Sequence, residues 1–229
     1  MKRILFLSAV FCLFGLSAFS ASTIDGTTGL IMMPTAESLK YKEFDVAADW
    51  VLRSTTTNSS AANRALWKYK ANIGAFGGLE LGFVGQNDRE GVFINMKYYL
   101  ISDNTKYPLK MAIGLNNLTS YTKTNAYMVA SKRFNPVVGG HFGFRADLSN
   151  GETRTSLLLG LEYFNSEQLA WISDLDGQGS QYLINTGLRY SFHPNALINV
   201  SLVNLTNQFV STDYPGTSLS IGLAWTDFL

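Results

Sequence analysis

The chain has 229 residues and a formal net charge of +1, and only 15% of its residues are charged. This near balance argues against a nucleic-acid-binding protein, which would carry a clear basic excess. Its single cysteine, Cys12, leaves no pair for a disulfide, so the fold must be stable without one.

The first twenty residues have the pattern of a secretory signal peptide. Lys2 and Arg3 precede an apolar run over residues 4–16, and the small-x-small triplet 18–20 follows it. We expect residues 1–20 to be removed, which leaves about 209 residues with a net charge of about −1 and no cysteine. A retained anchor helix is the alternative, but the apolar run is short for crossing a bilayer.

The stretch "GTTGLIMMPTA" at 26–36 follows neither a helical nor a strand period. Gly26 and Gly29 permit tight backbone paths, and Pro34 favours an extended chain while removing a hydrogen-bond donor. Apolar side chains lie between them. We therefore predict a separate N-terminal segment over residues 21–42, which packs at the periplasmic end of the following domain or partly inside it as a plug. An ordinary first strand ending at the proline is the alternative.

From residue 43 onward the sequence alternates with period two, as strands do. In "EFDVAADWVLR" at 43–53 one side is apolar and the other carries Asp45, Asp49 and Arg53. About twelve such segments follow one another in a single domain. They cover 43–53, 65–75, 79–86, 92–100, 109–117, 126–132, 141–148, 156–164, 168–174, 182–192, 196–204 and 218–228.

Segment length favours a membrane barrel over a soluble β-domain, which remains the alternative. Many segments run for nine to eleven residues, the length of a tilted strand that crosses a bilayer, whereas soluble strands average about five or six. In lipid only a closed sheet satisfies every backbone amide. We therefore predict an all-β fold: one transmembrane antiparallel up-and-down β-barrel of about twelve strands over residues 43–229, in the bacterial outer membrane.

The polar alternate positions would then face the lumen. Both charge signs occur among them, which predicts a salt-bridged and hydrated interior without strong selectivity for one ion sign. The predicted lumen-lining residues are Asp45, Asp49, Arg53, Lys68, Lys70, Lys97, Arg145, Asp147, Glu162, Asp174 and Arg189.

The connections and the last strand also fit an outer-membrane barrel. Long polar connections at 54–64 and 205–217 fall on the outside when counted from a periplasmic N-terminus. The connections "ISDNTKYP" and "RFNPVVGG" are longer than expected for periplasmic turns. The final "LSIGLAWTDFL" resembles the C-terminal strand that the barrel-insertion machinery recognises. Outer-membrane lipid and that machinery are thus expected partners.

The sequence offers no catalytic constellation, metal site or cofactor motif. His141 and His193 are interpreted as strand-boundary residues, and no local signature marks Ser131 or Ser156 as a nucleophile. Asp174 and Asp176 in "DLDGQGS" lack the further acidic ligand of a calcium loop, so this segment is interpreted as a loop tip.

Several segments resemble the YjbH-like family of outer-membrane proteins linked to exopolysaccharide secretion. "TGLIMMPTA" is similar to the Gly-Leu-x-x-x-Pro-Thr-Ala element that opens the barrel domain of that family. The matching residues of this element are Gly29, Leu30, Pro34, Thr35 and Ala36. Further similar segments are "LELGF" at 79–83, "NMKYYL" at 95–100, "AYMVASKRF" at 126–134 and "DLDGQGSQYLINTGLRY" at 174–190. Members of the family are often much longer than this chain.

The resemblance implies a non-enzymatic outer-membrane barrel. We expect an accessory or narrow channel in exopolysaccharide export or cell-envelope assembly, with secreted polysaccharide or its export proteins as possible partners and no cofactor. A polymer would slide on the wall charges and on Tyr99 or Phe93. Two alternatives stay open: a purely structural closed barrel, and a barrel enzyme acting on outer-membrane lipids.

Overall fold

The structure is a computed structural model that describes residues 21–53, 65–87, 91–101, 109–120, 122–148, 153–207, 214 and 216–229. The predicted signal peptide over residues 1–20 lies outside the described residues. In the described part of the chain, no helix is long and apolar enough to cross a membrane.

Twelve strands form one closed barrel in the order in which they occur along the chain. They are β1 Glu43–Leu52, β2 Ala65–Gly74, β3 Leu79–Gln86, β4 Val92–Ile101, β5 Lys110–Asn116, β6 Asn125–Asn135, β7 Val138–Asp147, β8 Arg154–Phe164, β9 Leu169–Gln178, β10 Gln181–His193, β11 Ala196–Val203 and β12 Ser218–Phe228. The prediction of an antiparallel up-and-down barrel of about twelve strands is confirmed.

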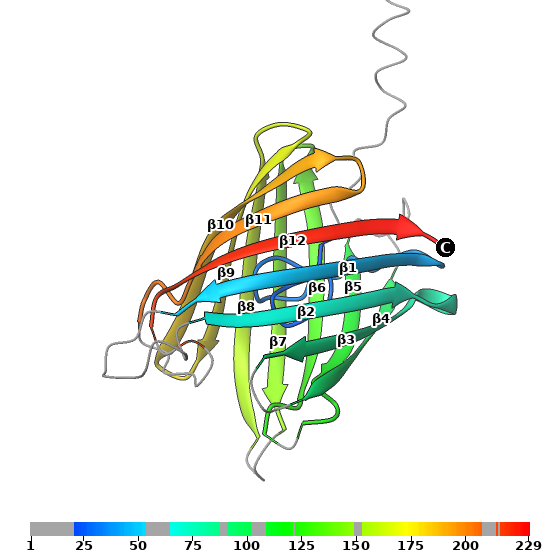
Figure 1. Cartoon of the computed structure of the whole chain (residues 1–229). Coiled ribbons are helices and arrows are strands. Elements are labelled where there is room, and N and C mark those ends of the chain that lie inside the picture. Colours follow the sequence, from blue (N-terminus) through cyan, green and yellow to red (C-terminus); the bar gives the residue numbers. More distant parts are fainter. Residues whose placement is uncertain are drawn as a thin grey trace, which may run out of the picture.

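The barrel closes where its first strand meets its last. β1 pairs antiparallel with β12 over ten residue pairs, from Glu43 opposite Phe228 to Leu52 opposite Leu219. The remaining pairs are antiparallel neighbours along the chain (Figure 1). Closure leaves no strand edge whose amides lack a partner, which is what a sheet surrounded by lipid requires.

The two ends of the barrel differ in the length of their connections. We call one the short-turn end: it holds the 3-10 turn η2 Phe76–Gly78 and the two-residue turn Pro194–Asn195. The opposite, long-loop end is where residues 53–64 and 204–217 join strands, although the tight turn 179–180 also lies there.

The expectation of a long connection at "RFNPVVGG" is wrong. β6 continues to Asn135 and β7 begins at Val138, so only two residues form the turn. Gly139 lies within β7, where a Cβ atom would collide with the side chain of Glu162 on β8. Glycine lowers strand propensity and hides this strand in the sequence, yet close side-chain packing requires it here.

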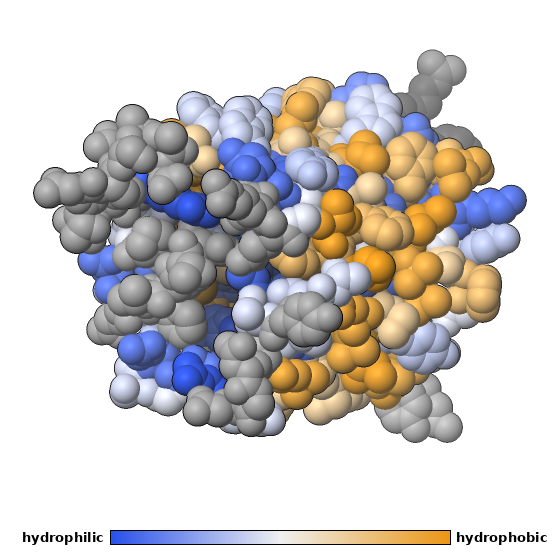
Figure 2. Space-filling model, turned by 60° about the horizontal axis from the view of Figure 1, so that its bottom comes forward, coloured by the Kyte–Doolittle hydropathy of each residue, from blue (hydrophilic) through white to orange (hydrophobic). Residues whose placement is uncertain are grey.

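The outer surface of the barrel is apolar and aromatic. Leu223, Phe144 and Trp67 are about half exposed on it, which is the arrangement expected of side chains that face lipid. Trp50 and Trp67 stack across β1 and β2, with ring centroids 5.8 Å apart. Figure 2 shows the apolar side chains gathered into a broad band with hydrophilic ones beside it.

The N-terminal segment lies inside the barrel. We call residues 21–42 the plug; its dark-blue trace crosses the interior of the ring of strands (Figure 1). Residues 21–39 are buried or half-buried, and the chain emerges at the short-turn end, where the Lys42 amide donates to the Gly74 carbonyl at 2.9 Å. A Cβ atom at Gly74 would collide with the carbonyl of Lys40, so glycine makes room for this exit.

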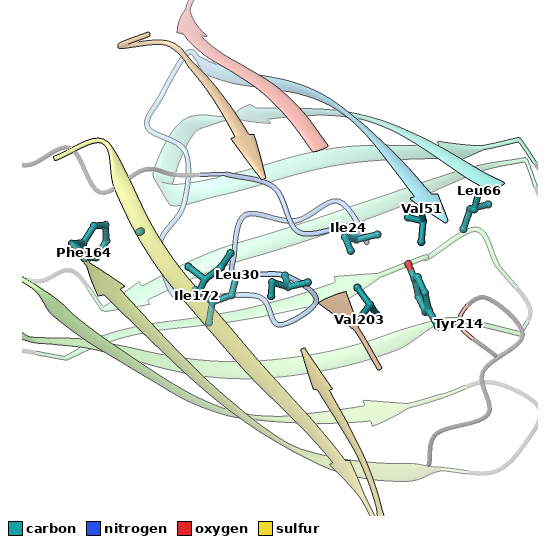
Figure 3. Close-up of a cluster of buried hydrophobic side chains, with 10 residues drawn as sticks. Ile24, Leu30, Val51, Leu66, Phe164, Ile172, Val203 and Tyr214 are labelled. Atoms are coloured by element: carbon teal, nitrogen blue, oxygen red, sulfur yellow. The ribbon is translucent and has the colours of Figure 1, made fainter. Parts of the chain in front are cut away.

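Apolar side chains of the plug pack against apolar side chains of the wall. Ile24, Leu30 and Ile31 contact a cluster that reaches along the lumen from Phe164 to Leu66 (Figure 3). Burial of these side chains contributes to stability roughly in proportion to their area. The polar and charged side chains of the wall bind main-chain atoms of the plug beside this apolar cluster.

Candidate functional site: the wall that binds the plug

The turn at residues 29–34 is the most strongly bound part of the plug. Gly29 and Pro34 form a bridge, and inside it the Leu30 amide donates to the Met33 carbonyl at 2.9 Å. The amides of three consecutive residues point outward from this turn and donate to Oδ2 of Asp174 on β9. These bonds come from Ile31 at 2.9 Å, Met32 at 2.8 Å and Met33 at 3.0 Å.

The neighbouring strand β10 completes this attachment. Asn185 donates to the other oxygen of Asp174 at 2.6 Å and so orients the carboxylate. Arg189 donates to the carbonyls of Gly29 at 2.9 Å and Leu30 at 3.2 Å. The turn is thus bound through its amides by a carboxylate and through its carbonyls by a guanidinium, and bonds of this charge-assisted kind are stronger than neutral ones.

A glycine on the wall makes space for the turn. A Cβ atom at Gly160 on β8 would come within 2.5 Å of a methyl group of Leu30 and 3.0 Å of the sulfur of Met33. The apolar residues of the "GLIMM" motif therefore rest directly on the backbone of the wall. A larger residue at position 160 would therefore require the side chains of Leu30 and Met33 to move.

A second attachment binds the plug backbone at two places, Thr28 and Leu39. Glu80 on β3 accepts the Thr28 amide at 3.0 Å, the Thr28 hydroxyl at 2.8 Å and the Leu39 amide at 3.1 Å. Lys97 on β4 lies 3.3 Å from Glu80 and donates to the Thr28 carbonyl at 3.1 Å and to the Glu37 carbonyl. Both wall side chains are essentially fully buried.

Three further wall groups hold the plug backbone individually. Lys70 donates to the Thr23 carbonyl at 2.8 Å, and Asn95 donates to the Asp25 carbonyl at 2.8 Å. Ser131 accepts the Ala36 amide at 2.8 Å. Wall groups on six strands thus bind main-chain atoms of the plug. Because most of these contacts are to peptide groups, they satisfy a buried backbone that has no sheet partner of its own.

The two acidic side chains of the enclosed plug pair with wall lysines. Asp25 accepts from Lys68 at 2.8 Å, and Glu37 lies 3.4 Å from Lys110. Burial by itself raises the pKa of the Asp25 carboxyl, but the Lys68 ammonium, helped by Arg145 and Lys123, holds that pKa below its ordinary value.

The eleven predicted wall residues divide into three groups by their partners. Lys68, Lys70, Lys97, Asp174 and Arg189 bind the plug as described above. Asp49 pairs with Lys70, Asp147 with Arg145 at 3.2 Å, and Glu162 with Arg133 at 3.5 Å, so these contacts connect wall to wall. Asp45 is buried and accepts from Asn72 at 3.1 Å, and Arg53 directly follows the end of β1.

Wall charges pair with one another, as in Asp49 with Lys70 and Glu80 with Lys97, but the plug occupies lumen that was expected to be hydrated. The crevice between Thr28, Leu30, Glu162 and Arg189 has no room for a water molecule. Four of the predicted cations donate to plug groups, and two of these, Lys70 and Lys97, have a wall carboxylate as well. The physical reason is that a peptide segment enclosed in the lumen brings its own unpaired amides and carbonyls, and the wall groups satisfy them.

Several residues of the plug attachment were absent from the predicted set, namely Glu80, Asn95 and Ser131, which bind the plug, and Asn185, which orients Asp174. Each lies at a lumenal position of its strand, and alternation alone would have placed Glu80 there, between Leu79 and Leu81. No signal in the sequence pairs these residues with the plug, because the contacts join segments 41 to 95 residues apart, as between Leu39 and Glu80 or Ala36 and Ser131.

Two minor interpretations of the sequence need correction. His141 is not a boundary residue: it is buried on β7, 2.8 Å from the Ser131 hydroxyl and 3.5 Å from Glu162. Only the last two residues of "DLDGQGS" form a turn, since β9 extends to Gln178 and places Asp174 in the lumen. The wall register places Ser131 directly opposite His141, and Ser131 accepts from the plug residue Ala36.

No family model and no curated protein matches the chain. Solved structures of porins do. One of a KdgM porin has a TM-score of 0.58 at 12% identity, covering 82% of this chain and 99% of that one. One of a NanC porin has a TM-score of 0.51 at 13% identity, covering 81% and 99%. The chain has a porin-type barrel fold. At this level of identity the comparison concerns the fold alone.

Proposed function

We propose that this protein is a non-enzymatic outer-membrane barrel closed by its own N-terminal plug, which acts as an accessory or gated narrow channel in exopolysaccharide export or cell-envelope assembly. The observation that carries the proposal is the attachment of the plug turn at residues 29–34 by Asp174 and Arg189. Together with the apolar packing and the ion pairs of the plug, this attachment holds the lumen shut through non-covalent contacts. The barrel can therefore open without breaking a covalent bond or a strand pair.

The apolar outer band and the porin-type fold support an outer-membrane location. Export directed by residues 1–20 and insertion by the barrel-insertion machinery belong to the same proposal. The C-terminal segment that resembles an insertion signal is strand β12, which closes the barrel against β1.

The chemistry of the wall favours a displaceable plug over a purely structural filling. Apolar side chains would fill a permanently closed lumen at least as stably, since buried ion pairs often contribute little net stability. This wall instead retains buried Glu80, Lys97, Asp174 and Arg189, all of which can be hydrated when the plug leaves. Each charged hydrogen bond contributes only about 1.5–3 kcal/mol, so displacement in steps is energetically accessible.

The resemblance to the YjbH-like family gains support from where its segments meet. Each of the four later segments contributes a residue that binds the plug: Glu80, Lys97, Ser131 and Asp174. The first segment, "TGLIMMPTA", is the part of the plug that they bind. These five segments, which are far apart in the sequence, thus form one structural unit. Such a unit is expected if the chain shares the whole set of segments with the family.

A saccharide cargo is supported by one of the structural comparisons. A solved structure of similar fold, with a TM-score of 0.57 and 13% identity, is of a KdgM porin in complex with disordered oligogalacturonate. A barrel of this architecture can therefore hold an oligosaccharide. We extend this to the present chain as a part of the proposal.

The lipid-acting enzyme is the weaker alternative. Ser131 and His141 lie on the lumenal side under the plug, whereas an enzyme acting on membrane lipid would need them on the outer wall. No observation on the described residues favours such an activity.

Planar-bilayer conductance tests the proposal. We expect the native protein to be mostly silent and D174N to show discrete openings, because loss of about 3 kcal/mol of attachment raises the displaced population about 100-fold. D147N is the matched control, since Asp147 pairs with wall Arg145 and touches no plug group. A D174N barrel that keeps its heat-modifiable migration but stays as silent as D147N would favour the structural closed barrel and contradict the proposal.

A further inference from the structure

The two wall side chains that bind the plug turn are held in place by the wall itself. Asp174 on β9 lies directly opposite Asn185 on β10, which donates to its Oδ1 at 2.6 Å. Arg189 on β10 lies directly opposite Asn199 on β11, and its Nε donates to the amide oxygen of that residue at 3.0 Å. All four residues belong to the barrel strands. We therefore expect the carboxylate and the guanidinium to keep their positions when the turn at residues 29–34 leaves.

The turn presents uncharged hydrogen-bonding groups to this pair. Oδ2 of Asp174 accepts from three amides between 2.8 and 3.0 Å, and one nitrogen of Arg189 donates to two carbonyl oxygens at 2.9 and 3.2 Å. The pair carries one charge of each sign. It thus offers an acceptor for several donors beside a donor for several acceptors, and it needs no charge from the group that it binds.

An apolar surface lies beside the pair. Gly160 on β8 is directly opposite Asp174, and a Cβ atom there would come within 2.5 Å of Leu30 and 3.0 Å of the Met33 sulfur, so the turn rests on bare backbone. Ile172, two residues before Asp174, belongs to the apolar cluster that Leu30 joins (Figure 3). One displacement of the turn therefore uncovers the apolar surface and the charged pair together.

A sugar residue has groups that match both parts of this site. A hydroxyl group is a donor and an acceptor, so neighbouring hydroxyls can donate to Asp174 and accept from Arg189. The apolar C–H face of the ring can rest on Gly160, where a side chain would exclude it. Because the charges of the pair balance, an uncharged sugar leaves no unpaired charge in the lumen, whereas a uronate adds one.

We propose that Asp174, Arg189 and Gly160 form a binding site for an uncharged sugar residue, and that the plug turn at residues 29–34 occupies this site in the closed barrel. The inference rests on the proposed function and deepens it, because it names the class of saccharide and the place where the saccharide competes with the plug. The saccharide takes over the hydrogen bonds of the turn, so its binding favours the open barrel.

A substitution in the plug can vacate the site without changing the wall. A Cβ atom at Gly29 would come within 2.3 Å of the Met33 carbonyl oxygen and 2.6 Å of a methyl group of Thr23, and both atoms belong to the plug. G29V therefore disrupts the turn from within. M33D is a second variant of this kind, because it buries a carboxylate next to Asp174, which accepts the Met33 amide.

Substitutions in the plug and in the wall should change affinity in opposite directions. We expect G29V and M33D to bind uncharged hexasaccharides at least about tenfold more tightly than the native protein, because the tethered competitor is displaced. Adding D174N or R189Q to G29V should weaken binding at least about tenfold, since each removes a charged hydrogen-bonding partner. Calorimetry on the full-length protein, in a detergent without a sugar headgroup, measures this with maltohexaose and cellohexaose. Heat-modifiable migration establishes that each variant is assembled.

Matched controls are available in the chain and in the ligand. D147N in the G29V background should leave affinity within about twofold, because Asp147 pairs with Arg145 and Gln178 of the wall. Hexagalacturonate has the same length and a carboxylate on each ring. D174N should not weaken its binding, since that substitution removes a negative charge.

Four results would overturn the proposal. They are binding of neither uncharged hexasaccharide to G29V or M33D, equal effects of D174N and D147N, equal weakening of hexagalacturonate by D174N, and no gain of the plug variants over the native protein. A peptide of residues 26–36 that binds G29V when neither hexasaccharide does would show that the site recognises a peptide instead.

The calorimetric test can fail separately from the bilayer test of the proposed function. If G29V and D174N both conduct but D174N leaves the affinity of G29V for the hexasaccharides unchanged, the sugar site is wrong and the gated barrel stands. If D174N stays silent in bilayers while G29V binds an uncharged hexasaccharide that the added D174N releases, the site stands and the gating is wrong.

Discussion

Glu80 and Lys97 lie directly opposite each other on β3 and β4, 3.3 Å apart, and both bind Thr28 of the plug. A wall ion pair and a plug residue therefore form one buried unit. Neither wall charge can be removed without leaving the other unbalanced, and this makes the pair the most sensitive point of the interior.

We predict that E80Q destabilises the barrel by about 3–5 kcal/mol, because it leaves the Lys97 ammonium buried without a counter-charge. Urea unfolding of the refolded protein, followed by tryptophan fluorescence, measures this. The double variant with E80Q and K97M should recover a part of the loss. An E80Q variant as stable as the native protein would show that the plug, rather than Glu80, balances the charge of Lys97.

Valine at position 160 should displace the plug turn while the sheet persists. The added side chain would occupy the space of Leu30 and Met33, as the close approach to Gly160 indicates. We expect G160V to increase single-channel openings with unchanged β-sheet circular dichroism. The double variant with G160V and L30A should be closed again, because the shorter side chain at position 30 makes room for the valine. Silence of G160V with native stability would count against a wall-seated turn.

Deletion of residues 26–36 should raise conductance or impair assembly. The segment carries the turn bound by Asp174 and the threonine bound by Glu80, so the deletion leaves both carboxylates to water. Bilayer recordings and the yield of heat-modifiable protein distinguish the two results. A deletion variant that assembles normally and stays closed would show that the plug does not close the barrel.

The contribution of Asp25 to the free energy of unfolding should decrease as the pH is lowered. Burial raises its pKa, but the Lys68 ammonium, with Arg145 and Lys123, brings it below the ordinary value of 3.8. The ionised form is favoured in the folded state, so the stabilisation is full above about pH 4 and is lost as the pH falls further. The difference in unfolding free energy between native and D25N should be constant at pH 5–7 and shrink below pH 4. A difference that shrinks on raising the pH from 5 to 7 would contradict this sign.

The protein should fractionate with the outer membrane and migrate differently in electrophoresis with and without heating. The physical reason is the apolar outer band, which only lipid or detergent can cover. A purified chain that stays monodisperse in buffer without detergent would rule out a membrane barrel.

Much of the architecture could be predicted from the sequence because side chains alternate across a strand. Alternation alone placed Asp45, Lys68 and Lys97 on one face and Trp67 on the other, and closure followed from the need to satisfy every amide in lipid. Strand ends were less certain. The segment predicted at 168–174 extends to Gln178 in the structure. The prediction ended too early because Gly177 has the sequence pattern of a loop residue.

The sequence by itself determined the strands, their two faces and an N-terminal segment unlike the strands. Only the tertiary structure decided what the lumenal charges bind. Asp174 and the amides of residues 31–33 are more than 140 residues apart along the chain, and no local pattern pairs them. They meet because barrel closure sets the register of β9 and because an enclosed peptide turn needs an acceptor for its amides.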